Sequence, residues 1–134
     1  MKKLIVLILF LAALGGLARF LWTEVDLYFN REYRLTIAYQ TYTGLYDSQA
    51  CREAYEFLTT GAKQTYSYDR FKVGCEADRN ISEISSIKDI VFLNAGFARI
   101  NVRQEMTDGK DKHIRDRATS WQLENNNWRR DWPN

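Results

Sequence analysis

The sequence predicts an α+β protein, in which a single N-terminal transmembrane helix is followed by about three helices packed on an antiparallel sheet. Three observations predict this class. The chain opens with a long apolar stretch, residues 31–58 repeat apolar side chains at helical spacing, and the last third alternates between apolar and polar residues. The 134 residues suffice for one folded domain and an appendage, but not for two domains.

The appendage is residues 1–22, a predicted transmembrane signal-anchor. Leu4–Trp22 carries Arg19 as its only charge, and as a helix it would measure about 28 Å, enough to cross a bilayer. The lysine pair at positions 2 and 3 predicts a cytoplasmic N-terminus, so residues 23–134 would form a domain outside the inner membrane, in the periplasm. The predicted anchor residues are Leu4, Leu7, Phe10, Leu14, Gly15, Gly16, Arg19 and Trp22.

A cleaved signal peptide is the alternative to the anchor. Its hydrophobic region would be Leu4–Leu14, and Gly16-Leu17-Ala18 would be the cleavage site. The apolar stretch resumes at residues 20–22 after Arg19, which favours the anchor. In both interpretations the folded part is exported.

Three helices are expected before the first strand. Residues 31–46 repeat apolar side chains, mostly tyrosines, at three- and four-residue spacing. Asp47-Ser48 should end this helix and cap a second one with its inner face at Ala50, Ala54, Phe57 and Leu58. Thr59-Thr60-Gly61 should break the run, and residues 67–75 predict a third, short helix.

The strands follow. Isoleucines at 81, 84, 87 and 90 are spaced as in a helix, but their β-branched side chains favour a strand. Phe97–Met106 alternates, with Ala98, Ile100, Val102 and Met106 on one face. Asp108-Gly109 predicts a hairpin into a strand at 113–124, and Asn125–Asn127 predicts a turn into a last strand at 128–132.

Cys51 and Cys75 are the two cysteines of the chain. An even number in an exported domain favours a disulfide, which would stabilise the fold by about 3–4 kcal/mol in the chain-entropy model. Two unpaired, small apolar residues are the alternative. Zinc needs more ligands than two cysteines and the single histidine, His113, so we predict no metal and no cofactor.

The charge balance argues against nucleic acid as a partner. Three of the 19 basic residues lie in the anchor, so residues 23–134 carry 16 basic and 17 acidic side chains. A polyanion-binding domain should show a basic excess or a basic stripe. Neither is present, and we therefore exclude nucleic acid.

The element order and the closing hairpin resemble a known superfamily. Helices come first, and a meander of long strands ends in Trp121-Gln122-Leu123-Glu124-Asn125-Asn126-Asn127-Trp128-Arg129-Arg130-Asp131-Trp132. Over residues 31–132 this is similar to the nuclear transport factor 2-like superfamily. The resemblance implies a bent sheet that wraps around the helices as a cone. Its members include isomerases and dehydratases, and also noncatalytic modules of membrane-anchored exported proteins, which this chain resembles more.

Catalytic members of that superfamily hold a carboxylate or histidine inside the cone, where desolvation raises a carboxylate's pKa. His113 lies beside a charged turn, where a solvated position is expected. Asp116 is the weak catalytic candidate, a possible base, because it would be buried if its face of the sheet is the concave one. A salt bridge to Arg99, Arg103 or Arg117 is the alternative. The tryptophans and tyrosines could line a ligand pocket or fill the core.

The leading functional hypothesis is a noncatalytic accessory or assembly subunit of an integral membrane protein complex, in contact with the lipid bilayer. Arginine outnumbers lysine eleven to five in residues 23–134, and arginine with tryptophan is typical of interface hot spots. The predicted contact residues are Arg99, Arg103, Arg117, Trp121, Trp128, Arg130 and Trp132. The alternatives are a small-molecule-binding or isomerase-type enzyme that uses the cone, and a freely secreted domain.

Overall fold

A computed structural model describes the backbone of residues 2–77, 82–108 and 110–131. Within these ranges, the side chains of residues 2–11, 23, 24, 26–29, 82–84 and 108 are not described. Three of the predicted anchor residues, Leu4, Leu7 and Phe10, and the predicted contact residue Trp132 therefore lie outside the described side chains. The chain divides into two compact units, residues 1–34 and residues 35–134.

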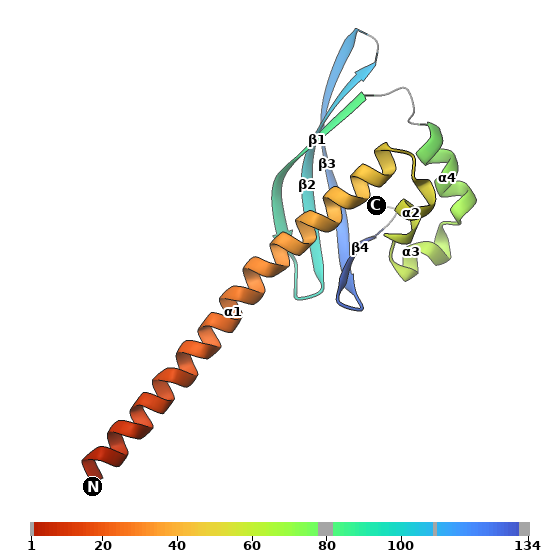
Figure 1. Ribbon diagram of the computed structural model, residues 1–134. Coiled ribbons are helices and arrows are strands. Elements are labelled where there is room, and N and C mark those ends of the chain that lie inside the picture. The colour runs from red at the N-terminus through yellow and green to blue at the C-terminus, as the bar shows by residue number, and fades with distance from the viewer. Residues whose placement is uncertain (1, 78–81, 109, 132–134) are drawn as a thin grey trace. The chain divides into compact units, whose positions relative to one another are not determined.

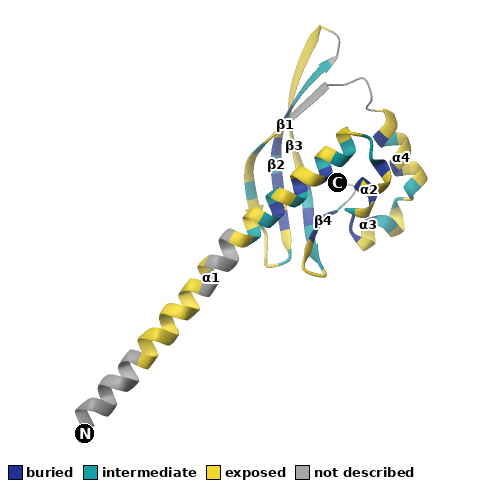
Figure 2. Cartoon of the chain, in the orientation of Figure 1, coloured by how far each residue is buried: buried dark blue, intermediate teal, exposed yellow. Residues whose placement is uncertain are grey.

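The first unit is helical. Helix α1 spans Lys2–Asp47, so the first unit contains its N-terminal part (Figure 1). The described residues 12–22 are all exposed, and Trp22 has 78% of its surface accessible (Figure 2). Within the described part of the chain, no helix is long and apolar enough to cross a membrane.

The second unit begins with the end of α1. Residues 31–46 are helical, as the periodicity predicts, and they form the C-terminal part of a longer helix. Leu35, Tyr39 and Tyr42 lie on its buried stripe, at spacings of four and three residues. The helix ends at Asp47, and Gln49 follows in the left-handed region with φ of 62°. This stop agrees with the Asp47-Ser48 signal.

Three short helices follow in the described residues 51–77: α2 (Cys51–Glu56), α3 (Thr60–Thr65) and α4 (Tyr68–Ala77). The expected cap of α2 by Asp47 or Ser48 is wrong, because Ala50 occupies the N-cap without a side-chain hydrogen bond, and the Ser48 hydroxyl donates to the Leu45 carbonyl at 3.2 Å. The Cys51–Cys75 disulfide is confirmed, and it joins α2 to α4. Helix α3 was not predicted.

The predicted break at residues 59–61 is in fact the start of α3. Thr59 is its N-cap, and the Thr59 hydroxyl accepts a hydrogen bond from the Ala62 amide at 3.0 Å. The same hydroxyl donates to Asp131 at 3.2 Å. Thr59 therefore caps the start of α3, and its hydroxyl also connects this helix to Asp131 in β4.

The sheet is an antiparallel meander, as predicted, in the order β1-β2-β3-β4. Its strands are β1 (Ser82–Phe92), β2 (Phe97–Asp108), β3 (Asp111–Glu124) and β4 (Asn127–Asp131). The register of β1 and β2 shifts between Ile87 and Asp89, which marks a bulge. Asn125 and Asn126 have φ of 49° and 63°, which is the geometry of a tight hairpin turn.

The core lies between the sheet and the helices (Figure 2), and Trp121 is at its centre with 0% of its surface exposed. Tyr39 and Tyr42 of α1 meet the Trp121 ring edge to face, with centroids 6.2 and 6.1 Å away. The indole N–H of Trp121 donates to the Thr119 hydroxyl at 3.0 Å. The aromatic stripe of α1 and the aromatic hairpin are thus two sides of one core.

Residues 57–59 run alongside the outer edge of β4. The Thr59 amide donates to the Arg130 carbonyl at 2.9 Å, and the Arg130 amide donates to the Phe57 carbonyl at 2.8 Å. Leu58 forms a parallel bridge with Arg130. The expected helical position of Phe57 and Leu58 is therefore wrong, because their backbone pairs with β4 instead.

Candidate functional site

The predicted contact residues separate by burial. Arg99, Arg103 and Arg117 are exposed. In contrast, Trp121, Trp128 and Arg130 are only 0%, 3% and 8% exposed. These three side chains hold the domain together, so the exposed arginines remain as the candidates for partner contact.

Arg130 is a cation inside the core. Its guanidinium lies over the Tyr42 ring, 4.9 Å from the centroid, in cation–π geometry. Burial lowers the pKa of Arg130, and the nearby Tyr42 counters part of that effect. Burial likewise raises the pKa of Tyr42, while the positive charge of Arg130 opposes the rise. This cation–π contact joins β4 to α1 and stabilises the packing of the two elements.

Asp116 lies on the outer face of the sheet. Its register partner is Arg103, which alternates with the buried Val102 and therefore points away from the core. The Asp116 carboxylate is 2.8 Å from Lys88 Nζ and 3.1 Å from Arg103 Nε, so the salt bridge with Arg103 is present. Hydrogen bonds from Lys88 first, and then from Arg103, lower the pKa of Asp116.

This environment suits an ion pair better than proton abstraction. Half of the Asp116 side chain is exposed, and a lowered pKa makes the carboxylate a weaker base at neutral pH. Lys112 and Glu105 form a second ion pair on the same face at 3.6 Å. The outer face therefore displays exposed, paired charges, and Arg99 lies on the same face four residues along β2 from Arg103.

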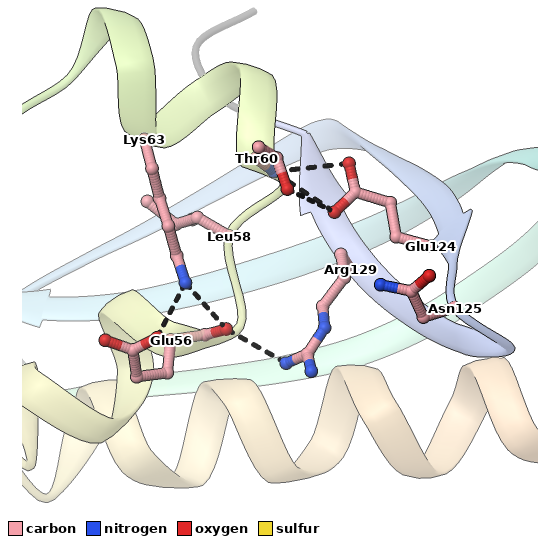
Figure 3. A pocket seen from close by; sticks show the side chains of 7 residues that line it. All are labelled: Glu56, Leu58, Thr60, Lys63, Glu124, Asn125 and Arg129. Atoms are coloured by element: carbon pink, nitrogen blue, oxygen red, sulfur yellow. Dashed lines mark hydrogen bonds and ion pairs between the residues drawn. The ribbon is translucent and has the colours of Figure 1, made fainter.

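A polar hollow of about 200 Å³ lies beside α3 (Figure 3). It is lined by Glu56, Leu58, Thr60, Lys63, Glu124, Asn125 and Arg129. Lys63 Nζ is 2.7 Å from a carboxylate oxygen of Glu56, and Arg129 donates to the Glu56 carbonyl at 2.9 Å. The hydrogen bond from Lys63 is the main cause of a lowered pKa of Glu56.

The other side of the hollow is formed by Glu124 and Thr60. Both Glu124 oxygens accept the Thr60 amide, at 3.1 and 3.2 Å, and one also accepts the Thr60 hydroxyl at 3.1 Å (Figure 3). The charged groups that line the hollow, Glu56, Lys63, Glu124 and Arg129, therefore each have a partner among the lining residues. Sequence reasoning missed this hollow, because its residues come from segments up to 73 positions apart and share no local pattern.

The described residues contain no group of three or more His, Cys, Asp or Glu side chains that could hold a metal ion. His113 is exposed on β3 and pairs in register with Met106. Comparison with known protein families found no matching family model, and comparison with curated proteins found no match either.

Proposed function

We propose that this chain is a noncatalytic accessory or assembly subunit of a membrane protein complex. Residues 4–22 would anchor it in the bilayer, and residues 35–134 would present a protein-binding surface on the periplasmic side. The observation that carries the proposal is the contrast between the two faces of the sheet. Aromatic rings fill the inner face around Trp121, whereas the outer face displays Arg99 and Arg103 to solvent.

The first unit supports the membrane part of the proposal. Leu14, Leu17, Phe20 and Leu21 are each 47–63% exposed, on a helix with Arg19 as the only charge in residues 4–22. So much apolar surface is costly in water and favourable in lipid. Trp22 stands at the end of the segment, where tryptophan favours the headgroup region.

The second unit supports a place in the nuclear transport factor 2-like superfamily. Helices that precede a four-stranded antiparallel meander match the element order of that superfamily. A cone formed by the sheet is part of the same proposal. A scaffold of this kind supports binding as readily as catalysis, so the function is inferred from the residues exposed on the outer face.

The test begins with cell membranes that contain the full chain. Extraction in mild detergent, native separation and mass spectrometry should find the chain in a band with other membrane proteins at fixed stoichiometry. Arg99→Glu should reduce its share of that band about tenfold, because a reversed charge on the contact face repels the partner. The control Lys110→Glu changes the charge equally, at the β2–β3 end of the sheet.

The result that contradicts the proposal is a monomer in mild detergent, with the intact chain still in the membrane fraction.

The anchor has a separate test. The chain should stay in the membrane pellet after alkaline washing, and Leu14→Asp with Leu17→Asp should release more of it than Leu14→Ala with Leu17→Ala. Release of the unmodified chain by the wash would remove the anchor.

A further inference from the structure

We propose that the outer face of the sheet binds a second copy of this chain, through the β1–β2 end of that face. This inference goes beyond the proposed function, because it does not depend on any other membrane protein. Arg99 belongs to both proposals. The two copies would meet through a small apolar patch that is bordered by one cation and one anion.

Three exposed apolar side chains lie together at the end of the sheet where β1 turns into β2 (Figure 1). The Leu93 amide donates to the Phe97 carbonyl at 2.9 Å, which continues the register in which Val91 pairs with Arg99. Phe97 and Arg99 flank the buried Ala98, so these four side chains share the outer face. Val91, Leu93 and Phe97 are 41%, 60% and 41% exposed. A contiguous apolar patch of this kind is typical of a protein contact.

Two opposite charges border the patch. Arg99 lies beside Val91 in the register, and Asp89 lies beside Asn101 in the next pair on the same face. Both charged side chains are exposed, and neither forms an ion pair among the described residues. The ion pairs of the outer face are formed by other residues, namely Lys88, Arg103 and Asp116, and Lys112 with Glu105. One positive and one negative charge are therefore available for a contact outside the chain.

A two-fold rotation makes this surface complementary to itself. An axis that runs along the strands, between β1 and β2, brings two outer faces together and exchanges the two strands. Register partners then meet across the contact, so Leu93 of one copy faces Phe97 of the other. This is the aligned packing of two sheets, with apolar side chains between them.

The same rotation brings the opposite charges within reach. Arg99 faces Val91 of the second copy, and Asp89 lies two residues along that strand, about 7 Å away. Long side chains span such a distance between diagonal neighbours. The rotation repeats the contact, so two Arg99–Asp89 ion pairs lie beside the apolar contact. A different protein would have to supply an acid, a base and an apolar patch in this arrangement, whereas the chain itself already does.

Charge exchange tests the inference. The contact is limited to two strands, so we expect a dimer that dissociates on dilution. Sedimentation of the full chain in mild detergent, over a dilution series, measures its association constant. Arg99→Glu and Asp89→Arg each place like charges opposite one another, and each should lower that constant about tenfold. Together in one chain they restore opposite charges, and the constant should return to within about threefold of the unmodified value.

A mixture of the two single variants gives the most specific test. In a mixed dimer, the introduced glutamate faces the introduced arginine, and the original Arg99 faces the original Asp89. The mixture should therefore associate about tenfold more tightly than either variant alone. No gain on mixing, or no recovery in the chain that carries both substitutions, would overturn the inference. An unmodified chain that is monomeric throughout the dilution series would overturn it as well.

The apolar patch has its own pair of variants. Leu93 and Ile114 are 60% and 63% exposed on the outer face, but Ile114 is on β3, outside the contact. Leu93→Ser should lower the association constant about tenfold, because it removes the side chain that faces Phe97 of the second copy. Ile114→Ser should leave the constant within about twofold of the unmodified value. Equal constants for these two variants would contradict the proposed contact.

A photo-crosslinking residue at position 93 identifies the occupant. The expected adduct joins two copies of this chain, and an adduct formed only with another protein or with lipid would overturn the inference. A dimer with no other membrane protein in its band leaves the inference standing and contradicts the proposed function. A single copy of the chain in a complex with other membrane proteins supports the proposed function and contradicts the inference.

Discussion

The arginines show how burial decides the role of a residue. Arg130 packs over Tyr42 inside the core, while Arg103 pairs with Asp116 on the outer face. From the sequence both were candidates for partner contact, because arginine and tryptophan are enriched at interfaces. The same two residue types also suit a core in which a guanidinium stacks on a ring. Residue type alone cannot separate these environments.

Tyr42 should make the stability of the domain depend on pH in the alkaline range. Its pKa is raised above 10.0 by burial, so the folded state holds the phenol proton more tightly than the unfolded state. This contribution is complete below pH 10 and is lost as the pH rises through the folded-state pKa. Urea unfolding between pH 8 and about pH 11 measures it, since that range brackets the ordinary tyrosine pKa.

Tyr42→Phe is the matched variant. At neutral pH it should change the free energy of unfolding by about 1 kcal/mol, because it removes one hydroxyl. Above pH 10 it should lose less stability than the unmodified chain. Parallel pH profiles for the two proteins would show that Tyr42 does not contribute to the pH dependence.

At the scale of elements, long periodic segments were predicted well, whereas α3 was missed and the bounds of α2 were misplaced. Residues 31–46 and the alternating Phe97–Met106 took the predicted structures. Helices α2 and α3 have six residues each, too few for periodicity to show. Their ends depend on distant partners, as in the pairing of residues 57–59 with β4.

Thr59→Ala should destabilise the domain by about 2 kcal/mol. The substitution removes the cap of the Ala62 amide and the hydrogen bond to Asp131, at a residue with 1% of its surface exposed. Thr59→Ser keeps the hydroxyl and should cost about 1 kcal/mol or less. Chemical denaturation compares the variants, and equal losses for Ala and Ser would contradict a capping role.

Loss of the Cys51–Cys75 disulfide should lower the free energy of unfolding by about 3 kcal/mol. The bond closes a loop with a sequence separation of 24, and its removal gives the unfolded chain more conformations. A variant with Cys51→Ala and Cys75→Ala should unfold at a lower denaturant concentration, and added reductant should not change its unfolding midpoint. A variant as stable as the oxidised protein would disprove the stabilising role.

At the scale of the whole molecule, the core is a property of residues 35–134. Every buried apolar side chain in the described part of the chain belongs to that unit, from Leu35 to Trp128. The anchor hypothesis and the domain are therefore separable in experiment. Helix α1 contributes residues to both units, because it continues through the boundary between residues 34 and 35.

A chain that starts at residue 23 should be soluble and should unfold, in the same detergent buffer, within about 1 kcal/mol of the full chain. A chain that starts at residue 48 should not fold, because it lacks Leu35, Tyr39 and Tyr42 beside Trp121. Circular dichroism with denaturant compares the three. Cooperative unfolding of the shortest chain would contradict the role of α1 in the core.

By itself, the sequence determined the α+β class, the meander, the helical aromatic stripe and the disulfide pair. These features depend on local periodicity, turn residues and the number of cysteines, which are visible along the chain. Only the tertiary structure decided that Trp121, Trp128 and Arg130 are internal, that Asp116 is paired outside, and that residues 57–59 pair with β4. The physical reason is that burial and pairing depend on which distant segments meet, and the local pattern does not contain that information.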